Sequence, residues 1–289
     1  MANDPDPRDP ELEAALARHL GKIPPPAWRT SLKHWLLGPE PFKPGGPKPE
    51  FLKEIRAYQR VGSTMDVAST LAEAGAPEAT LVWAVRQEQG RGRQGRVWES
   101  PEGGLYCSLI LRPSRDLSEI PQLSLVAGLA VGEAIRDATS LFPKIRWPND
   151  LLLEDRKVGG ILVEAKSGAV IIGIGINITT KPSALPDSAT SLLANTIPQM
   201  PRPEPYPLTG ALVKHFQRWY EEWSANGFAP VREALRSWMA FFGRPVHITA
   251  GSVNYEGTLH DLDEAGRLLV RLDTGIIKQF DMGEVTLLR

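Results

Sequence analysis

The chain has 289 residues, which is enough for one large domain or two modest ones with a substantial core. Its 33 lysines and arginines nearly balance its 34 aspartates and glutamates, and the net charge of −1 argues against a surface devoted as a whole to nucleic acid. A single cysteine, Cys107, excludes an intrachain disulfide framework. A hydrophobic fraction of 42% excludes a chain that is disordered along its whole length.

The N-terminal residues are rich in proline. Eleven of the 26 prolines fall in the first 50 residues, where they interrupt any long helix. Residues 1–50 are therefore predicted to form a proline-rich extension, with one short amphipathic helix over 11–20 and an extended tether over 38–49. A DNA-reading winged helix is the alternative, although the segment is short, electrically neutral and broken by proline.

From residue 51 the pattern changes to strands and helices. Apolar runs, caps and turn residues predict strands over 54–58, 80–85, 105–111, 150–153, 158–165 and 170–178, and helices over 63–74, 123–135, 208–224 and 231–242. Short strands over 246–249, 254–259, 268–272, 276–280 and 284–287 indicate a small SH3-like β-barrel. The expected class is α+β, with a catalytic domain over 51–242 and the barrel over 243–289.

The strongest candidate for a binding site is the loop from Arg86 to Trp98, which carries four arginines, one glutamate and three glycines. Arginine forks suit carboxylates and phosphates, glycines let the backbone approach a ligand, and Trp98 can stack on a nucleobase or on an arginine. A solvated segment that touches RNA non-specifically is the alternative. The position of the loop between two apolar strands favours a binding loop on a rigid sheet.

Three further segments carry weaker signals. In 146–150, an amide and a carboxylate on a proline turn can orient a ligand or hold Mg²⁺, or they form a simple turn. In 155–160, Lys157 can face an anion, or the segment is a solvated hairpin tip. In 173–177, two glycines can admit a flat ligand, or they belong to a closely packed core strand. No third glycine and no helix follow, which excludes a dinucleotide-binding fingerprint.

In their order and spacing, these segments resemble the biotin–protein ligase family. The similar positions are Ser63-Thr64, Gln87, Gly90–Trp98, Trp147–Asp150, Asp155–Lys157, Gly160–Glu164, Gly173-x-Gly175-x-Asn177, Ala189–Leu192 and Gly283–Val285. The resemblance covers residues 51–289 and implies a mixed β-sheet catalytic domain of the biotin/lipoate ligase type, without the winged helix of the repressor-type members. It also implies that biotin and MgATP form biotinyl-5′-adenylate, from which biotin passes to a lysine of a biotin carboxyl-carrier protein or domain.

The resemblance further implies a role for each matching residue. Lys157 and Arg93 are the expected catalytic residues. Biotin is expected to contact Ser63, Thr64, Gln87, Gly90, Arg91, Gly92, Arg93, Lys157, Gly173 and Gly175. The nucleotide is expected to contact Arg96, Trp98, Asn149 and Asn177, with Asp150 as the metal ligand. Met65 departs from the asparagine that many members carry, and Arg146 departs from the usual lysine.

The expected ligands are thus biotin, ATP and Mg²⁺, with no membrane or nucleic-acid partner. A homodimer is compatible with the resemblance, because the family contains monomers and dimers. The sequence has no apolar run of about 18 residues and no signal-peptide pattern, so a cytoplasmic location is expected. A lipoate ligase or octanoyltransferase is the nearest alternative, followed by a non-enzymatic nucleic-acid-binding regulator. The intact Gly-Arg-Gly-Arg-x-Gly loop and the C-terminal barrel favour biotin.

Overall fold

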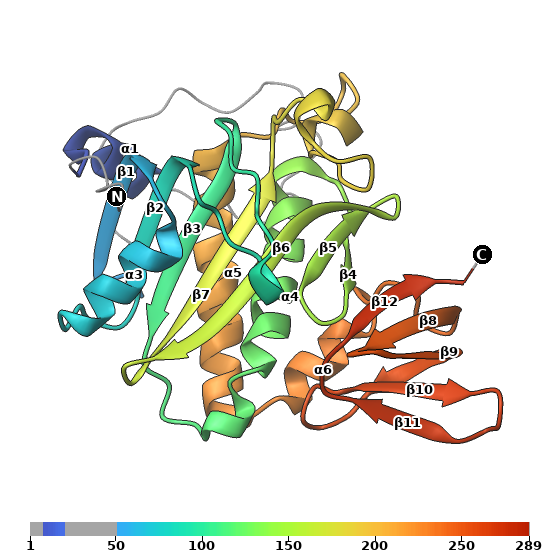
Figure 1. Cartoon of the computed structure of the whole chain (residues 1–289). Helices are drawn as coiled ribbons and strands as arrows, with labels where there is room; N and C mark the ends of the chain where they lie inside the picture. The colour runs from blue at the N-terminus through green and yellow to red at the C-terminus, as the bar shows by residue number, and fades with distance from the viewer. Residues whose placement is uncertain (1–7, 21–50, 289) are drawn as a thin grey trace, which may run out of the picture.

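The computed structural model describes residues 8–20 and 51–288, which form two β-sheets with helices packed against the larger one (Figure 1). The short helix predicted over 11–20 is present as α1 (Pro10–Leu20), which packs beside the larger sheet and buries Leu12 and Leu16. The tether predicted over 38–49 lies outside the described residues. No helix in the described part of the chain is both long and apolar enough to cross a membrane.

The larger sheet has seven strands in the order β1-β2-β3-β7-β6-β5-β4, and only β1 and β2 run parallel to each other. These strands are β1 (Glu54–Val61), β2 (Thr80–Gln87), β3 (Gly104–Leu111), β4 (Lys144–Arg146), β5 (Asp150–Leu153), β6 (Arg156–Lys166) and β7 (Ala169–Asn177). The antiparallel strands predicted between residues 150 and 178 are confirmed. The mixed sheet and the α+β class agree with the expectation from sequence.

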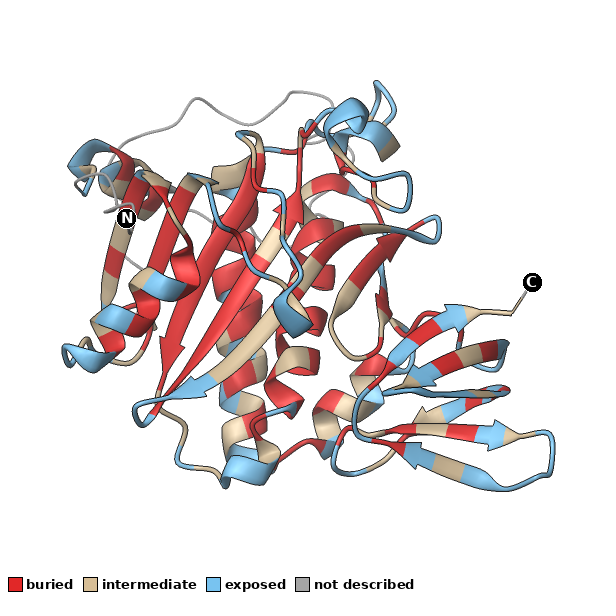
Figure 2. Cartoon of the chain, in the orientation of Figure 1, coloured by how far each residue is buried: buried red, intermediate tan, exposed pale blue. Residues whose placement is uncertain are grey.

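Helices cover both faces of this sheet, because its central strands are apolar on both sides. In β2, Leu81 and Trp83 belong to one hydrophobic cluster and Val82 and Ala84 to another, as expected of side chains that alternate between faces. The helices are α3 (Thr64–Glu73), α4 (Gln122–Thr139), α5 (Pro205–Asn226) and α6 (Ala229–Leu235), with 3₁₀ turns at Arg93–Gly95, Leu117–Glu119, Pro182–Ala184 and Leu193–Asn195. Helices α4 and α5 pack on the first cluster and α3 on the second, so the central strands are buried (Figure 2).

One predicted helix is wrong in length. The sequence predicts a helix over 231–242, whereas α6 ends at Leu235. The chain beyond α6 pairs with the edge strand β4: the Ile145 amide donates to the Trp238 carbonyl at 2.7 Å, and the Ala240 amide donates to the Ile145 carbonyl at 2.8 Å. Because an edge strand leaves backbone groups in need of partners, these bonds compete with further turns of helix.

The smaller sheet contains the five short strands predicted near the C-terminus, all antiparallel, in the order β11-β10-β9-β8-β12. They are β8 (Pro245–Ala250), β9 (Val253–Leu262), β10 (Leu268–Leu272), β11 (Ile277–Phe280) and β12 (Glu284–Leu287). The Trp147 indole Nε1 donates to the Gly266 carbonyl at 3.0 Å, and Arg232 and Arg236 both pair with Asp261. These contacts fix the smaller sheet beside the 146–150 turn.

Candidate functional site

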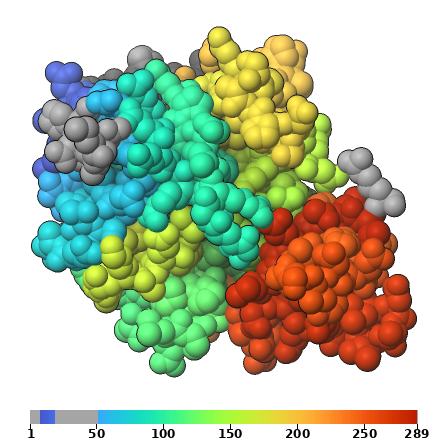
Figure 3. Space-filling view, in the orientation of Figure 1, coloured from blue at the N-terminus to red at the C-terminus, as the bar shows by residue number. Residues whose placement is uncertain are grey.

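A cavity opens where the 86–98 loop, the start of α3, the 146–150 turn and β7 meet, and the start of β12 forms part of its wall. The predicted site residues that line it are Ser63, Thr64, Gln87, Arg91, Gly92, Arg93, Arg96, Trp98, Asn149, Asp150, Lys157, Gly173 and Gly175. Figure 3 shows the outer surface of the loop meeting the C-terminal sheet. Arg96 of the loop pairs with Glu284 of β12. Both sheets therefore contribute to the cavity.

The wall beside the start of α3 is polar. The Ser63 hydroxyl caps this helix by accepting a hydrogen bond from the Met65 amide at 3.2 Å. The Thr64 amide and hydroxyl donate to Gln87 Oε1 at 2.8 and 3.0 Å, and the Ser108 hydroxyl donates to Thr64 Oγ1 at 2.9 Å. Hydroxyl and carboxamide groups fixed in this way suit a small ring that carries both donors and acceptors.

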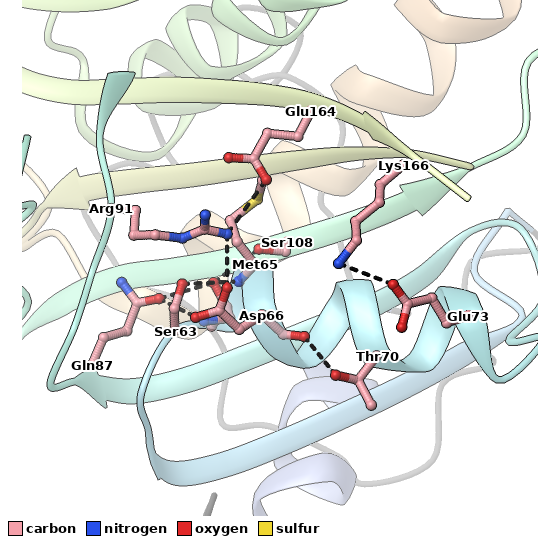
Figure 4. Close-up of polar contacts among 11 residues, drawn as sticks. Ser63, Met65, Asp66, Thr70, Glu73, Gln87, Arg91, Ser108, Glu164 and Lys166 are labelled. Atoms are coloured by element: carbon pink, nitrogen blue, oxygen red, sulfur yellow. Dashed lines mark hydrogen bonds and ion pairs between the residues drawn. The ribbon is translucent and has the colours of Figure 1, made fainter. Parts of the chain in front are cut away.

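Arg91 connects α3 and β6 at the edge of this polar wall. Its Nη2 lies 2.8 Å from Asp66 Oδ1 and 3.4 Å from Glu164 Oε2 (Figure 4). A second ion pair, between Lys166 Nζ and Glu73 Oε1 at 2.9 Å, joins the same two elements farther along. All of these side chains are at least one third exposed, so each ion pair contributes only modestly to stability. The two Arg91 pairs connect the 86–98 loop to α3 and β6, and the Lys166 pair connects α3 to β6.

A group of charges defines another part of the cavity, centred on Asp150. Its Oδ2 accepts a hydrogen bond from Arg146 Nη2 at 2.5 Å, and its Oδ1 lies 2.6 Å from Lys157 Nζ, in an ion pair whose angles are not those of a hydrogen bond. The Lys157 ammonium also lies 5.2 Å from the centre of the Trp98 ring, a distance typical of a cation–π contact. Lys157 is thus held by two independent contacts on the cavity wall.

Arg93 brings a partly desolvated cation to the same region. Its Nη1 donates to Asn149 Oδ1 at 2.9 Å, and Asn149 Nδ2 donates to the Ile161 carbonyl at 3.1 Å. Burial lowers the pKa of the Arg93 guanidinium below its ordinary value, while Asp150 opposes this effect and Arg96 adds to it. Because the guanidinium of arginine is strongly basic, Arg93 stays charged at neutral pH and can neutralise an anion.

Several glycines of the motifs make room for Trp98. A Cβ at Gly175 would lie 2.6 Å from Trp98 Nε1, and a Cβ at Gly160 would lie 3.2 Å from the ring. A Cβ at Gly90 would lie 2.3 Å from the Trp98 carbonyl oxygen. Trp98 therefore packs directly on the backbones of β6 and β7, which a side chain at either strand position would obstruct.

Two predicted contact residues, Gly90 and Asn177, do not line the cavity. Gly90 lies against the backbone of Trp98, whose amide donates to the Gly90 carbonyl at 2.9 Å. Asn177 is 2% exposed, and its Nδ2 donates to the Thr190 carbonyl at 3.0 Å. The Thr190 amide in turn donates to the Lys157 carbonyl at 2.8 Å. Asn177 therefore fastens the loop after β7 to the strand that carries Lys157.

Other wall residues were given no role in the site from the sequence, although some of them belong to the segments that carry the resemblance. Residues 283–286 at the start of β12 line the cavity, although the sequence places them far from every other motif. Met65 and Arg146 also line it, as do Leu162 and Ile174. An alternating strand pattern gives no signal that the end of a strand faces a second sheet. Of these wall residues, only Met65 and Arg146 could therefore have been singled out from the sequence.

Asp150 does not fit the predicted role of a resident metal ligand. Both of its oxygens face cations, and Asn149 Oδ1 is taken by Arg93. Within residues 8–20 and 51–288, no group of three or more His, Cys, Asp or Glu residues could hold a metal ion. Magnesium prefers several unshared oxygen ligands, which this set does not offer.

Two family models match the chain. Residues 57–180 match that of the Biotin/lipoate A/B protein ligase family, and residues 241–288 match that of the Biotin protein ligase C terminal domain. The bifunctional ligase/repressor BirA of Bacillus subtilis is 36% identical over 248 residues, which cover 81% of this chain and 74% of that protein. The biotin--[acetyl-CoA-carboxylase] ligase of Paracoccus denitrificans is 34% identical over 204 residues, which cover 67% of this chain and 85% of that protein.

Solved structures give the same picture. The biotin protein ligase from Aquifex aeolicus in complex with biotin and ATP matches with a TM-score of 0.72 and 31% identity, covering 82% of this chain and 100% of that chain. The biotin protein ligase from Leishmania major in complex with biotinyl-5-AMP matches with a TM-score of 0.57 and 28% identity, covering 81% of this chain and 100% of that chain.

Proposed function

The chain belongs to the biotin/lipoate A/B protein ligase family, with the C-terminal domain of its biotin ligases, and we propose that it is an ATP-dependent biotin protein ligase. The observation that carries this proposal is one cavity that joins a polar wall to a cluster of cations. The polar wall of Ser63, Thr64 and Gln87, with Ser108 hydrogen-bonded to Thr64 behind it, suits the ureido ring of biotin. The cations Arg93 and Lys157 suit its carboxylate and the phosphates of ATP.

In the first step, a carboxylate oxygen of biotin attacks the α-phosphorus of ATP, and the bond to the β-phosphate breaks to release pyrophosphate. Two anions meet in this step, so fixed positive charge lowers its barrier. We assign this role to Lys157 and Arg93, with Arg96 beside the phosphates. Magnesium enters as the counter-ion of ATP and is therefore part of the substrate.

In the second step, the neutral amine of a lysine on a biotin carboxyl-carrier protein attacks the carbonyl carbon of the adenylate. An amide bond forms, the bond to the phosphate oxygen breaks, AMP leaves, and the attacking nitrogen gives up one proton to solvent. The adenylate also reacts with water, so the site has to exclude solvent between the two steps. The 86–98 loop is suited to this task, because Arg91 and Arg96 tie it to α3, β6 and the C-terminal sheet.

Asp150 is proposed to position Lys157. Its carboxylate is 13% exposed and lies between Arg146 and Lys157, so it fixes the ammonium on the cavity wall without removing it from the cavity. Asn177 is proposed to position Lys157 indirectly. It binds the Thr190 carbonyl, and the Thr190 amide binds the Lys157 carbonyl.

The organisation around this site is also a proposal. We divide the chain into a proline-rich extension over 1–50, a catalytic domain over 51–242 and a C-terminal domain over 243–289. We expect a cytoplasmic protein that does not bind nucleic acid, because the N-terminal residues are neutral and the net charge is −1. Salt-dependent binding to duplex DNA tests this expectation, and homodimer formation is measured by sedimentation.

The decisive experiment supplies biotin and lipoate side by side. Purified protein is mixed with MgATP, a biotin carboxyl-carrier domain and either acid, and both pyrophosphate release and carrier labelling are measured. Biotin is expected to support both, and lipoate neither. Transfer of lipoate or octanoate in place of biotin would assign the chain to the other branch of its family.

A further inference from the structure

Two glycines of β7 are covered by side chains from outside the strand. Gly173 and Gly175 are two residues apart, so they face the same side of the sheet and lie about 7 Å apart. The space that a side chain at Gly175 would occupy is filled by Trp98, as described above. The corresponding space at Gly173 is filled by Met65: a Cβ there would lie 2.6 Å from Met65 Sδ and 2.9 Å from its Cγ.

Met65 reaches this position from the first turn of α3. It is 4% exposed and packs in the hydrophobic cluster beneath α3, yet its side chain also lines the cavity. Its amide donates a hydrogen bond to the Ser63 hydroxyl (Figure 4). Its neighbour Thr64 donates the hydrogen bonds to Gln87. The apolar thioether and the polar wall are therefore held by consecutive residues of one helix turn.

This arrangement changes what a ring in the cavity contacts. The motif Gly173-x-Gly175 predicts a ligand lying directly on the strand backbone. With Met65 over the first glycine, a ring at the polar wall meets a thioether where the side-chain face of Gly173 would otherwise lie open. A methionine side chain is flexible and polarisable, so it adapts to an apolar ring without adding a hydrogen-bond requirement.

We propose that Met65 determines specificity for the ring of the carboxylic-acid substrate, by limiting the depth of the pocket above Gly173 and contacting the thiolane part of biotin. The ureido part then faces Thr64 and Gln87. The proposal rests on the proposed function, because it concerns the acid that the same cavity activates.

The first test compares biotin with desthiobiotin, which keeps the ureido ring and the carboxylate but lacks the thiolane ring. Adenylation is measured as pyrophosphate release at saturating ATP. Met65→Ala is expected to raise the KM for biotin about tenfold, the equivalent of about 1.4 kcal/mol, and the KM for desthiobiotin about twofold or less. The kcat at saturating biotin and the KM for ATP are expected to change less than twofold. The lost contact with the ring stabilises bound biotin and the transition state equally, so its loss affects only the KM for biotin.

The second test asks what fills the space at Gly173. Gly173→Ala places a methyl group within 2.6 Å of Met65 Sδ, so it is expected to displace Met65 into the pocket and raise the KM for biotin about 100-fold. In Met65→Ala/Gly173→Ala, the methyl group has free space, and the KM is expected to return to within about threefold of Met65→Ala alone. If biotin itself touches Gly173, the double variant stays as impaired as Gly173→Ala.

Controls separate specificity from folding. Met239→Ala removes a methionine that is 5% exposed and lies outside the cavity lining, and it is expected to leave the KM for biotin unchanged. Thermal melting of each variant reports folding. Should Met65→Ala fail to fold, Met65→Leu replaces it: leucine is shorter, and a shift of about threefold in the ratio of the two KM values is expected.

The outcomes are distinct. Wild-type protein that does not use biotin refutes the proposed function. Wild-type protein that uses biotin, with an unchanged biotin-to-desthiobiotin ratio in the Met65 variants or no recovery in the double variant, refutes the role of Met65.

Discussion

Asp150→Asn tests whether this carboxylate positions Lys157 or holds a metal ion. The substitution keeps the shape of the side chain and removes its negative charge. Arg146 Nη2 at 2.5 Å and Lys157 Nζ at 2.6 Å then lose their shared counter-charge. Lys157 keeps only its contact with the Trp98 ring, so its ammonium is expected to leave the position from which it neutralises the reacting anions.

The structure sets the size of this effect. Removing one partner of a buried, hydrogen-bonded charge pair costs about 2–5 kcal/mol. The Asp150 side chain is 13% exposed, but those of Arg146 and Lys157 are 27% and 30% exposed, so solvent compensates part of the loss. We therefore expect the low end, about 2 kcal/mol, which corresponds to roughly a 30-fold fall in the rate of adenylation.

The assay is single-turnover formation of biotinyl-5′-adenylate across a series of Mg²⁺ concentrations. The expected result for Asp150→Asn is a lower rate at every Mg²⁺ concentration, with an unchanged half-saturating concentration. Asp155→Asn is the matched control, because Asp155 is exposed in the turn before β6 and does not line the cavity. A normal rate at high Mg²⁺ would instead identify Asp150 as a metal ligand, and an unchanged rate throughout would remove it from the mechanism.

Three further predictions concern single features of the site and fold. Lys157→Ala is expected to slow adenylation about 10²- to 10³-fold with little change in melting temperature, and an unchanged rate of pyrophosphate release would exclude Lys157 as a catalytic residue. Asp66→Asn combined with Glu164→Gln removes both ion pairs of Arg91 and is expected to raise the KM for biotin about two- to fivefold, since exposed ion pairs contribute about 0.2–1 kcal/mol. A KM equal to that of the wild type would show that these ion pairs do not position the loop for biotin binding. Burial alone would lower the pKa of His215, but bonds to Asp137 and Glu133 outweigh it and raise that pKa. Folded protein then keeps a proton that unfolded protein loses above a pH of about 6.5, so melting temperature is expected to fall as pH rises through the folded pKa, and His215→Gln is expected to flatten that slope.

Much of the fold follows from local patterns. The Ser63 cap and the glycine at position 75, which has a φ of +85°, set the ends of α3 close to those predicted. The strands between residues 150 and 178 were predicted equally well, because short apolar runs and turns act over a few residues. The end of α6 was not, because its last turns compete with hydrogen bonds to β4, which lies far away in sequence.

The candidate site divides in the same way. The arginines, glycines and Lys157 were selected from their motifs, and most of them line one cavity. The pairs that they form were not predicted: Arg91 meets Asp66 and Glu164, and Arg96 meets Glu284, which come from elements far from the loop in sequence. Asp150 illustrates the difference: the Pro-Asn-Asp turn suggests an oxygen ligand for Mg²⁺, whereas two cations from neighbouring strands surround the carboxylate.

By itself, the sequence determined which chemical groups are present and in what order, and hence the α+β class and the family resemblance. Net charge near zero concealed a loop rich in arginine, which the motif exposed. Only the tertiary structure decided which group meets which. Glu284 pairs with Arg96 because the smaller sheet packs beside the loop, and Met65 covers Gly173 because α3 packs across β7. The physical reason is that contact distances depend on how helices and sheets pack against one another, and residue spacing along the chain does not record that packing.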